Sequence, residues 1–185
     1  MAFTAQDVKK LREMTNVGMM DCKKALQATD GDMDKAVDWL REKGLAKAAK
    51  KAGRIAAEGV AYAAVIDGVG VVIEVNSETD FAAKTDAVLA LVKKPAVIAA
   101  HENPADVEAL KACTYPGTDR TVSDVTADKV LAIGENIQIR RFVRYAEGVN
   151  VPYIHMGGKI GVLVNMEVEG IDAAQVTELG KDVAM

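Results

Sequence analysis

The chain has 185 residues, of which 50% are hydrophobic and 27% charged, which suits a folded protein of one or two domains and excludes general disorder. A net charge of −4 argues against a general nucleic-acid binder, because phosphate binding needs a basic face. The two cysteines lie far apart in the chain, which predicts a protein without disulfides. The N-terminus lacks a signal peptide's apolar region, and no apolar stretch is long enough to span a membrane, so we expect a cytoplasmic protein.

Residues 1–44 predict an N-terminal module of three short helices. Thr4 precedes the first helix and Asp32 precedes the third, and both residue types cap helix N-termini. Apolar residues recur at helical spacing from Met33 to Leu40. Gly44 then stands where a C-terminal glycine cap belongs, so the third helix is expected to end there.

The following alanine-rich segment, residues 45–58, predicts a linker helix with a basic face. Its cations are Lys47, Lys50, Lys51 and Arg54. Such a face is either solvated or contacts RNA, although no aromatic residue interleaves with it to stack on bases. A ribosome- or RNA-associated module that uses residues 47–54 therefore stays open as an alternative function.

Residues 60–76 begin a different region and predict a β-hairpin. Two apolar runs flank Asp67-Gly68, the commonest short hairpin signal. A helical stretch over residues 82–92 follows, and Lys93, Lys94 and Pro95 are expected to close it. Residues 137–145 alternate in polarity as a strand does.

The hairpin pattern is repeated later in the chain. At an offset of 91 positions, Val60, Tyr62 and Gly70 correspond to Val151, Tyr153 and Gly161. Each copy reads as strand, glycine turn, strand and helix. The sequence therefore predicts an α+β core of two related hairpin-plus-helix subdomains, residues 59–147 and 148–185.

Thr79-Asp80-Phe81 follows the first hairpin, where the second copy has Gly170-Ile171-Asp172 instead. The fold of the unit therefore does not require the tripeptide. Either Asp80 caps the next helix and Phe81 packs against it, or Phe81 serves a partner. Met19-Met20 leaves the same choice open between core packing and a partner surface.

The sequence carries no recognisable catalytic motif. "GVGVV" and "GGKIG" suggest phosphate loops, but each joins two strands and does not open a helix. His101 and His155 lack companions at metal-ligand spacing. We therefore expect a non-catalytic binding protein that uses no metal or cofactor of its own.

Five stretches together resemble the elongation factor Ts family. They are Leu11 to Leu26 (LREMTNVGMMDCKKAL), Ala46 to Gly53 (AKAAKKAG), Glu74 to Phe81 (EVNSETDF), Ile133 to Arg141 (IGENIQIRR) and Tyr153 to Val164 (YIHMGGKIGVLV). The resemblance implies a ubiquitin-associated-like N-terminal module, a core of two related subdomains and guanine nucleotide exchange on elongation factor Tu in its GDP form. It implies neither direct nucleotide binding by this chain nor a membrane or nucleic-acid partner.

The resemblance also implies which residues meet the partner. The segment Thr79, Asp80, Phe81 and Ala82 enters the partner's G domain beside its magnesium site. Arg12, Met19 and Met20 lie on the docking face of the N-terminal module, and Ile133 and His155 meet another domain of the partner.

Two departures from the family pattern qualify these expectations. Ala82 replaces the valine that often follows Phe81 in the family, so the buttress behind the aromatic ring is smaller. The chain stops at Met185, inside the helix that begins near Asp172. We therefore expect either a fragment or an unusually short member, with an incomplete second subdomain.

Overall fold

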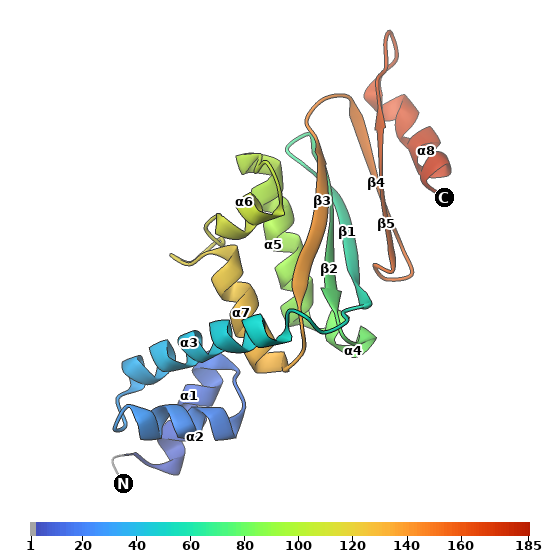
Figure 1. The fold of residues 1–185 in the computed structure, drawn as a ribbon. Helices are drawn as coiled ribbons and strands as arrows, with labels where there is room; N and C mark the ends of the chain where they lie inside the picture. Colours follow the sequence, from blue (N-terminus) through green and yellow to red (C-terminus); the bar gives the residue numbers. More distant parts are fainter. Residues whose placement is uncertain (1–2) are drawn as a thin grey trace.

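The computed structural model describes residues 3–185 and shows helices combined with two antiparallel β-sheets (Figure 1), as the α+β prediction requires. The elements in chain order are α1 (Ala5–Thr15), α2 (Met19–Ala28), α3 (Met33–Lys51), β1 (Glu58–Ile66), β2 (Val69–Ser77), α4 (Asp80–Ala83), α5 (Asp86–Glu102), α6 (Val107–Ala112), α7 (Val122–Ile133), β3 (Gln138–Tyr145), β4 (Val149–His155), β5 (Ile160–Met166) and α8 (Ala173–Ala184). Among the described residues, none of these helices combines the length and the apolar character that a membrane crossing needs.

The first three helices pack around a small core to which Leu131 of α7 also contributes. Leu11, Cys22, Leu26 and Leu40 are buried at its centre. Thr4 and the third residue of α1 form the expected capping box, and Asp32 accepts a hydrogen bond from the backbone N–H of Lys35 at 3.0 Å. The three-helix prediction is confirmed, whereas the likeness to a ubiquitin-associated domain stays a prediction.

The expected end of the third helix at Gly44 is wrong. α3 continues to Lys51, so the first half of the predicted linker helix is the end of α3, and residues 52–57 form an irregular connection. The close approach of α7 explains why a residue without a side chain stands at position 44 inside the helix. A Cβ at Gly44 would lie 3.3 Å from the Ala127 carbonyl oxygen. Whether residues 1–44 and 45–58 act as separate units stays a prediction.

The central sheet has the strand order β1-β2-β3, and α5 packs against one of its faces (Figure 1). Asp67 and Gly68 both have positive φ and form the predicted two-residue turn between β1 and β2. α5 runs through Pro95 to Glu102, so the expected helix end near residue 93 is wrong. Pro95 itself is buried in the core side of α5, and packing there offsets the missing hydrogen bond.

The second hairpin, β4–β5, lies on the opposite face of the central sheet, and α8 covers its outer side (Figure 1). Both copies of the repeat thus form a hairpin followed by a helix. Their registers differ by two residues, because β1 and β2 are joined by two residues and β4 and β5 by four. Gly161 sits against Ala61 of β1, whose backbone N–H donates to the Gly158 carbonyl at 2.7 Å.

Candidate partner-binding site

Thr79-Asp80-Phe81 lies at the end of the central sheet where β2 ends (Figure 1). Thr79 is the N-cap of the short helix α4, and its side chain accepts the Ala82 N–H at 3.3 Å. Ala82 and Ala83 form the buried side of α4, whereas the Phe81 side chain is 81% exposed. The reading in which Asp80 caps the helix and Phe81 packs against it is therefore wrong.

Two carboxylates brace this loop from both sides. Glu135 accepts the N–H of Thr79 at 3.0 Å and its hydroxyl at 2.7 Å. In the opposite direction, Glu78 accepts the N–H of Asn136 at 2.6 Å. This hydrogen bond, with the nearby Arg54 cation, lowers the pKa of Glu78. The loop that presents Phe81 is thus tied to residues 134–136.

Sequence reasoning did not assign a role to Glu78 or Glu135. The available signal was that both lie within stretches carrying the family resemblance, EVNSETDF and IGENIQIRR. Neither stretch taken alone indicates that its carboxylate accepts a hydrogen bond from the other stretch, because Glu135 and Thr79 are 56 positions apart in the chain.

Asp80 is placed to present a negative charge beside Phe81. Its carboxylate forms an ion pair with Lys84 at 2.7 Å, and this contact lowers the pKa of Asp80. Lys159, on the turn between β4 and β5, adds a smaller effect in the same direction through its charge. Asp80, which precedes Phe81 in α4, is therefore ionised at neutral pH.

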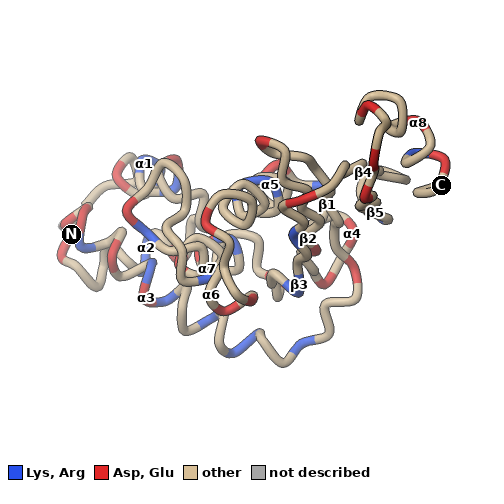
Figure 2. Tube along the Cα trace, turned by 90° about the horizontal axis from the view of Figure 1, so that it is seen from above, with Lys and Arg blue, Asp and Glu red and all other residues tan. Residues whose placement is uncertain are grey.

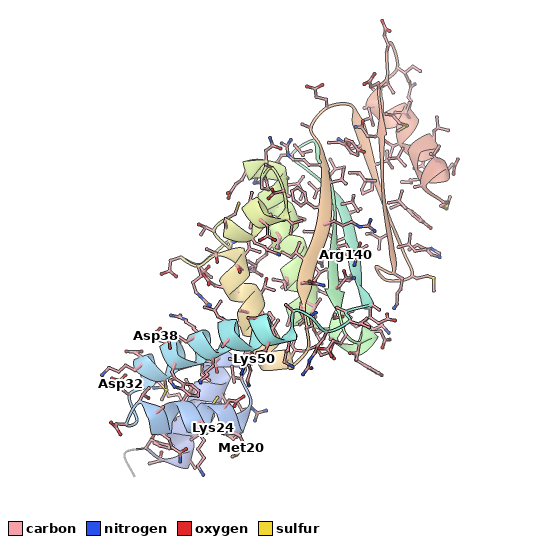
Figure 3. The ribbon with its side chains drawn as sticks, viewed as in Figure 1. Met20, Lys24, Asp32, Asp38, Lys50 and Arg140 are labelled. Atoms are coloured by element: carbon pink, nitrogen blue, oxygen red, sulfur yellow. The ribbon has the colours of Figure 1, made fainter. Side chains whose placement is uncertain are left out.

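Arg12, Met19 and Met20 lie on the surface of the N-terminal helices. Met19 is 45% exposed and Met20 64% exposed, so neither is a core residue. Figure 3 labels Met20 on α2. Met14 of α1 is exposed as well. Core packing is therefore ruled out for both methionines, and their contact with a partner stays a prediction.

Ile133 and His155 differ in how much surface they offer. Ile133 is half-buried against the central core at the end of α7, directly before the loop that braces Thr79. His155 is exposed at the end of β4, where its Nδ1 lies 3.2 Å from the Tyr153 hydroxyl and the two rings stack. Met156, which follows it in the turn, is 70% exposed and was not predicted as a site residue.

The structure therefore gathers the predicted residues at two places. The α4 loop, the end of α7 and the β4–β5 turn lie at one end of the sheets, whereas Arg12, Met19 and Met20 belong to the N-terminal helices (Figure 1). Over residues 3–185 no group of three or more His, Cys, Asp or Glu side chains is arranged to hold a metal ion.

The basic segment is largely engaged within the molecule. Lys47 pairs with Asp21 at 2.8 Å, Lys51 donates to the Gly134 carbonyl and Arg54 contacts Glu78 at 3.4 Å. Figure 2 shows acidic and basic residues interleaved along the N-terminal helices. These contacts weaken the RNA-binding alternative, because the cations do not form one free surface of uniform sign.

Comparison with known proteins shows which family shares this part of the chain. A sequence model of the family described as Elongation factor TS matches residues 78–185, which include α4, the bracing loop and the second hairpin. The chain belongs to the elongation factor Ts family.

Relatives extend the similarity to the N-terminal helices. An elongation factor Ts of Magnetococcus marinus is 51% identical over 188 residues, which cover 100% of this chain and 61% of the relative. Those of Alkalilimnicola ehrlichii and Clostridioides difficile are 53% and 52% identical, over 100% and 99% of this chain and 62% and 61% of their own lengths. The chain thus spans about three fifths of the length of these elongation factor Ts relatives.

Proposed function

We propose that this chain is a guanine nucleotide exchange factor that acts in translation elongation in the cytoplasm. It binds elongation factor Tu in its GDP form and promotes GDP release. The observation that carries the proposal is Phe81: a large aromatic side chain, 81% exposed, is held on a braced loop in a family of elongation factors. Exposed aromatic residues on rigid supports are typical anchors of protein interfaces.

In the proposed mechanism, residues 79–82 enter the G domain of elongation factor Tu beside its magnesium site. The Phe81 ring wedges between elements of the partner and displaces the groups that hold the magnesium ion. Asp80, ionised through its contact with Lys84, competes for polar groups nearby. The chain itself forms no covalent bond and binds no nucleotide, so it is not an enzyme in the usual sense.

The energetic basis is linkage between two binding events. The factor binds best to a partner conformation that holds nucleotide poorly, and nucleotide therefore displaces the factor in return. The rate of exchange rises while the overall equilibrium between GDP and GTP stays unchanged. Through Arg12, Met19 and Met20 the N-terminal helices bind the partner. Ile133 and His155 contact a second domain of the partner.

The test is release of a fluorescent GDP from elongation factor Tu. We expect the intact chain to accelerate release and Phe81→Ala to reduce that acceleration at least about tenfold, because interface anchors contribute 2 kcal/mol or more. Tyr145→Ala is the matched control: Tyr145 is a half-exposed aromatic that pairs with Gly70, at the other end of the central sheet.

The outcomes separate the function from its mechanism. Acceleration that survives Phe81→Ala would leave the exchange function in place and reject the wedge. Binding without acceleration would show that the remaining two fifths of the relatives' length is needed for exchange. An absence of binding would reject the proposed function for this chain.

A further inference from the structure

Ile55 is the most exposed large hydrophobic residue in the described part of the chain. Its side chain is 86% exposed, slightly more than that of Phe81. It lies in the irregular connection between α3 and β1, a segment that the sequence predicts only as part of a basic linker. The exchange mechanism proposed above gives Ile55 no role.

The connection that carries Ile55 is held in place by side-chain contacts. The Arg54 carbonyl accepts the Asn136 side-chain N–H at 2.8 Å, and the Arg54 guanidinium contacts Glu78 at 3.4 Å. Three residues after Ile55, Glu58 begins β1 and pairs with Lys159. Ile55 is therefore displayed between two anchored residues of a short connection.

The same contacts support the Phe81 loop. Glu78 is one of the carboxylates that brace this loop, and Asn136 donates its backbone N–H to Glu78 while its side chain binds Arg54. The two most exposed large apolar side chains thus stand on segments that share one hydrogen-bonded frame. The same segments carry paired charges: Arg54 with Glu78, Lys84 with Asp80, and Glu58 with Lys159.

We infer that Ile55 is a second apolar contact of the surface that carries Phe81, and that it inserts into the same GTPase partner. The inference rests on the proposed function and extends it to a residue and segment not assigned above. An apolar centre with a charged rim is the usual composition of a protein interface, in which the rim limits access of water to the centre. The shared frame favours one occupant for both side chains over a separate partner for Ile55.

The experiment measures the affinity of the nucleotide-free partner for the intact chain and for Ile55→Ser. We expect binding to weaken about 10- to 100-fold, since serine lacks most of the apolar area that isoleucine would bury against the partner. Ile55→Val should retain most of the affinity. Thermal unfolding of Ile55→Ser should match that of the unsubstituted chain, because an 86% exposed side chain adds little to the core.

Ile171→Ser is the matched control. Ile171 is 54% exposed and belongs to the loop between β5 and α8, at the far end of the sheets from α4 (Figure 1). Equal affinities for Ile55→Ser and Ile171→Ser would overturn the inference. If Phe81→Ala still weakened exchange in that case, the proposed function would stand and only the role of Ile55 would fail. A chain that neither binds nor accelerates GDP release would overturn both.

Discussion

Thr79 combines two interactions at the point where the Phe81 loop leaves β2. Its hydroxyl oxygen caps α4 by accepting the Ala82 N–H, and the same hydroxyl donates to Glu135 at 2.7 Å. A threonine can do both because one hydroxyl is a donor and an acceptor at once. Thr79 therefore links the start of α4, two positions before Phe81, to the bracing carboxylate of Glu135.

The Thr79→Val variant tests the two hydrogen bonds of the hydroxyl without changing the shape of the side chain. Valine keeps the branched volume but loses the hydroxyl, so the free energy of unfolding should fall by about 1 kcal/mol, as for the loss of a helix cap. GDP-release activity should fall as well, because the loop loses part of its brace. Urea unfolding and the release assay measure the two effects, and Thr79→Ser should preserve both; a fully active Thr79→Val would show that the brace is dispensable.

Glu78 makes the stability of this loop depend on pH. Its pKa in the folded chain is lowered, chiefly by the Asn136 N–H, so the folded state binds a proton less readily than the unfolded state does. Its contribution to stability is present above the unfolded pKa of about 4.3 and is lost as pH falls through the lower folded value. Glu78→Gln should therefore flatten the dependence of unfolding free energy on pH below about 4.5, and an unchanged slope would contradict this role.

At the scale of elements, local signals predicted much of the fold. The Asp67-Gly68 turn, the caps at Thr4 and Asp32 and both hairpins are present as expected, because each depends on residues close together in the chain. The errors arose where distant segments decide. Gly44 resembles a helix stop until α7 is seen beside it, and the bracing carboxylates lie in separate stretches. The exposed state of Phe81 likewise depends on the whole fold.

The contact between α3 and α7 gives a prediction for the attachment of the N-terminal helices. A Cβ at Gly44 would lie 3.3 Å from the Ala127 carbonyl oxygen and 3.7 Å from the Leu131 Cβ, so the longer side chain of Gly44→Leu has no room. We expect a loss of about 1–3 kcal/mol in unfolding free energy, measured in urea. Gly53→Leu is the control, since no atom lies within 4 Å of its Cβ position. Equal effects at both positions would contradict close packing here.

For the whole molecule, the proposed function requires that the two hairpins keep a fixed relation. Phe81 follows the first hairpin and His155 ends the first strand of the second, so a shift between them would separate two parts of the proposed partner surface. Their contact is tight at Gly161, where a Cβ would lie only 2.9 Å from the Ala61 Cβ. Glycine in a strand normally lowers stability, and the close approach of the hairpin to β1 gives a reason for it here.

A double-mutant cycle tests whether this contact holds the hairpins together. Gly161→Ala should lower the unfolding free energy by about 1 kcal/mol or more, although alanine is the better strand residue, because its methyl group meets Ala61. Ala61→Gly removes that methyl, so the double variant should be more stable than the sum of the single effects predicts, by about 1 kcal/mol. GDP-release activity should fall in Gly161→Ala and recover in the double variant. Strictly additive effects would mean that the hairpins are held together elsewhere, and the surface formed by Phe81 and His155 would then need another support.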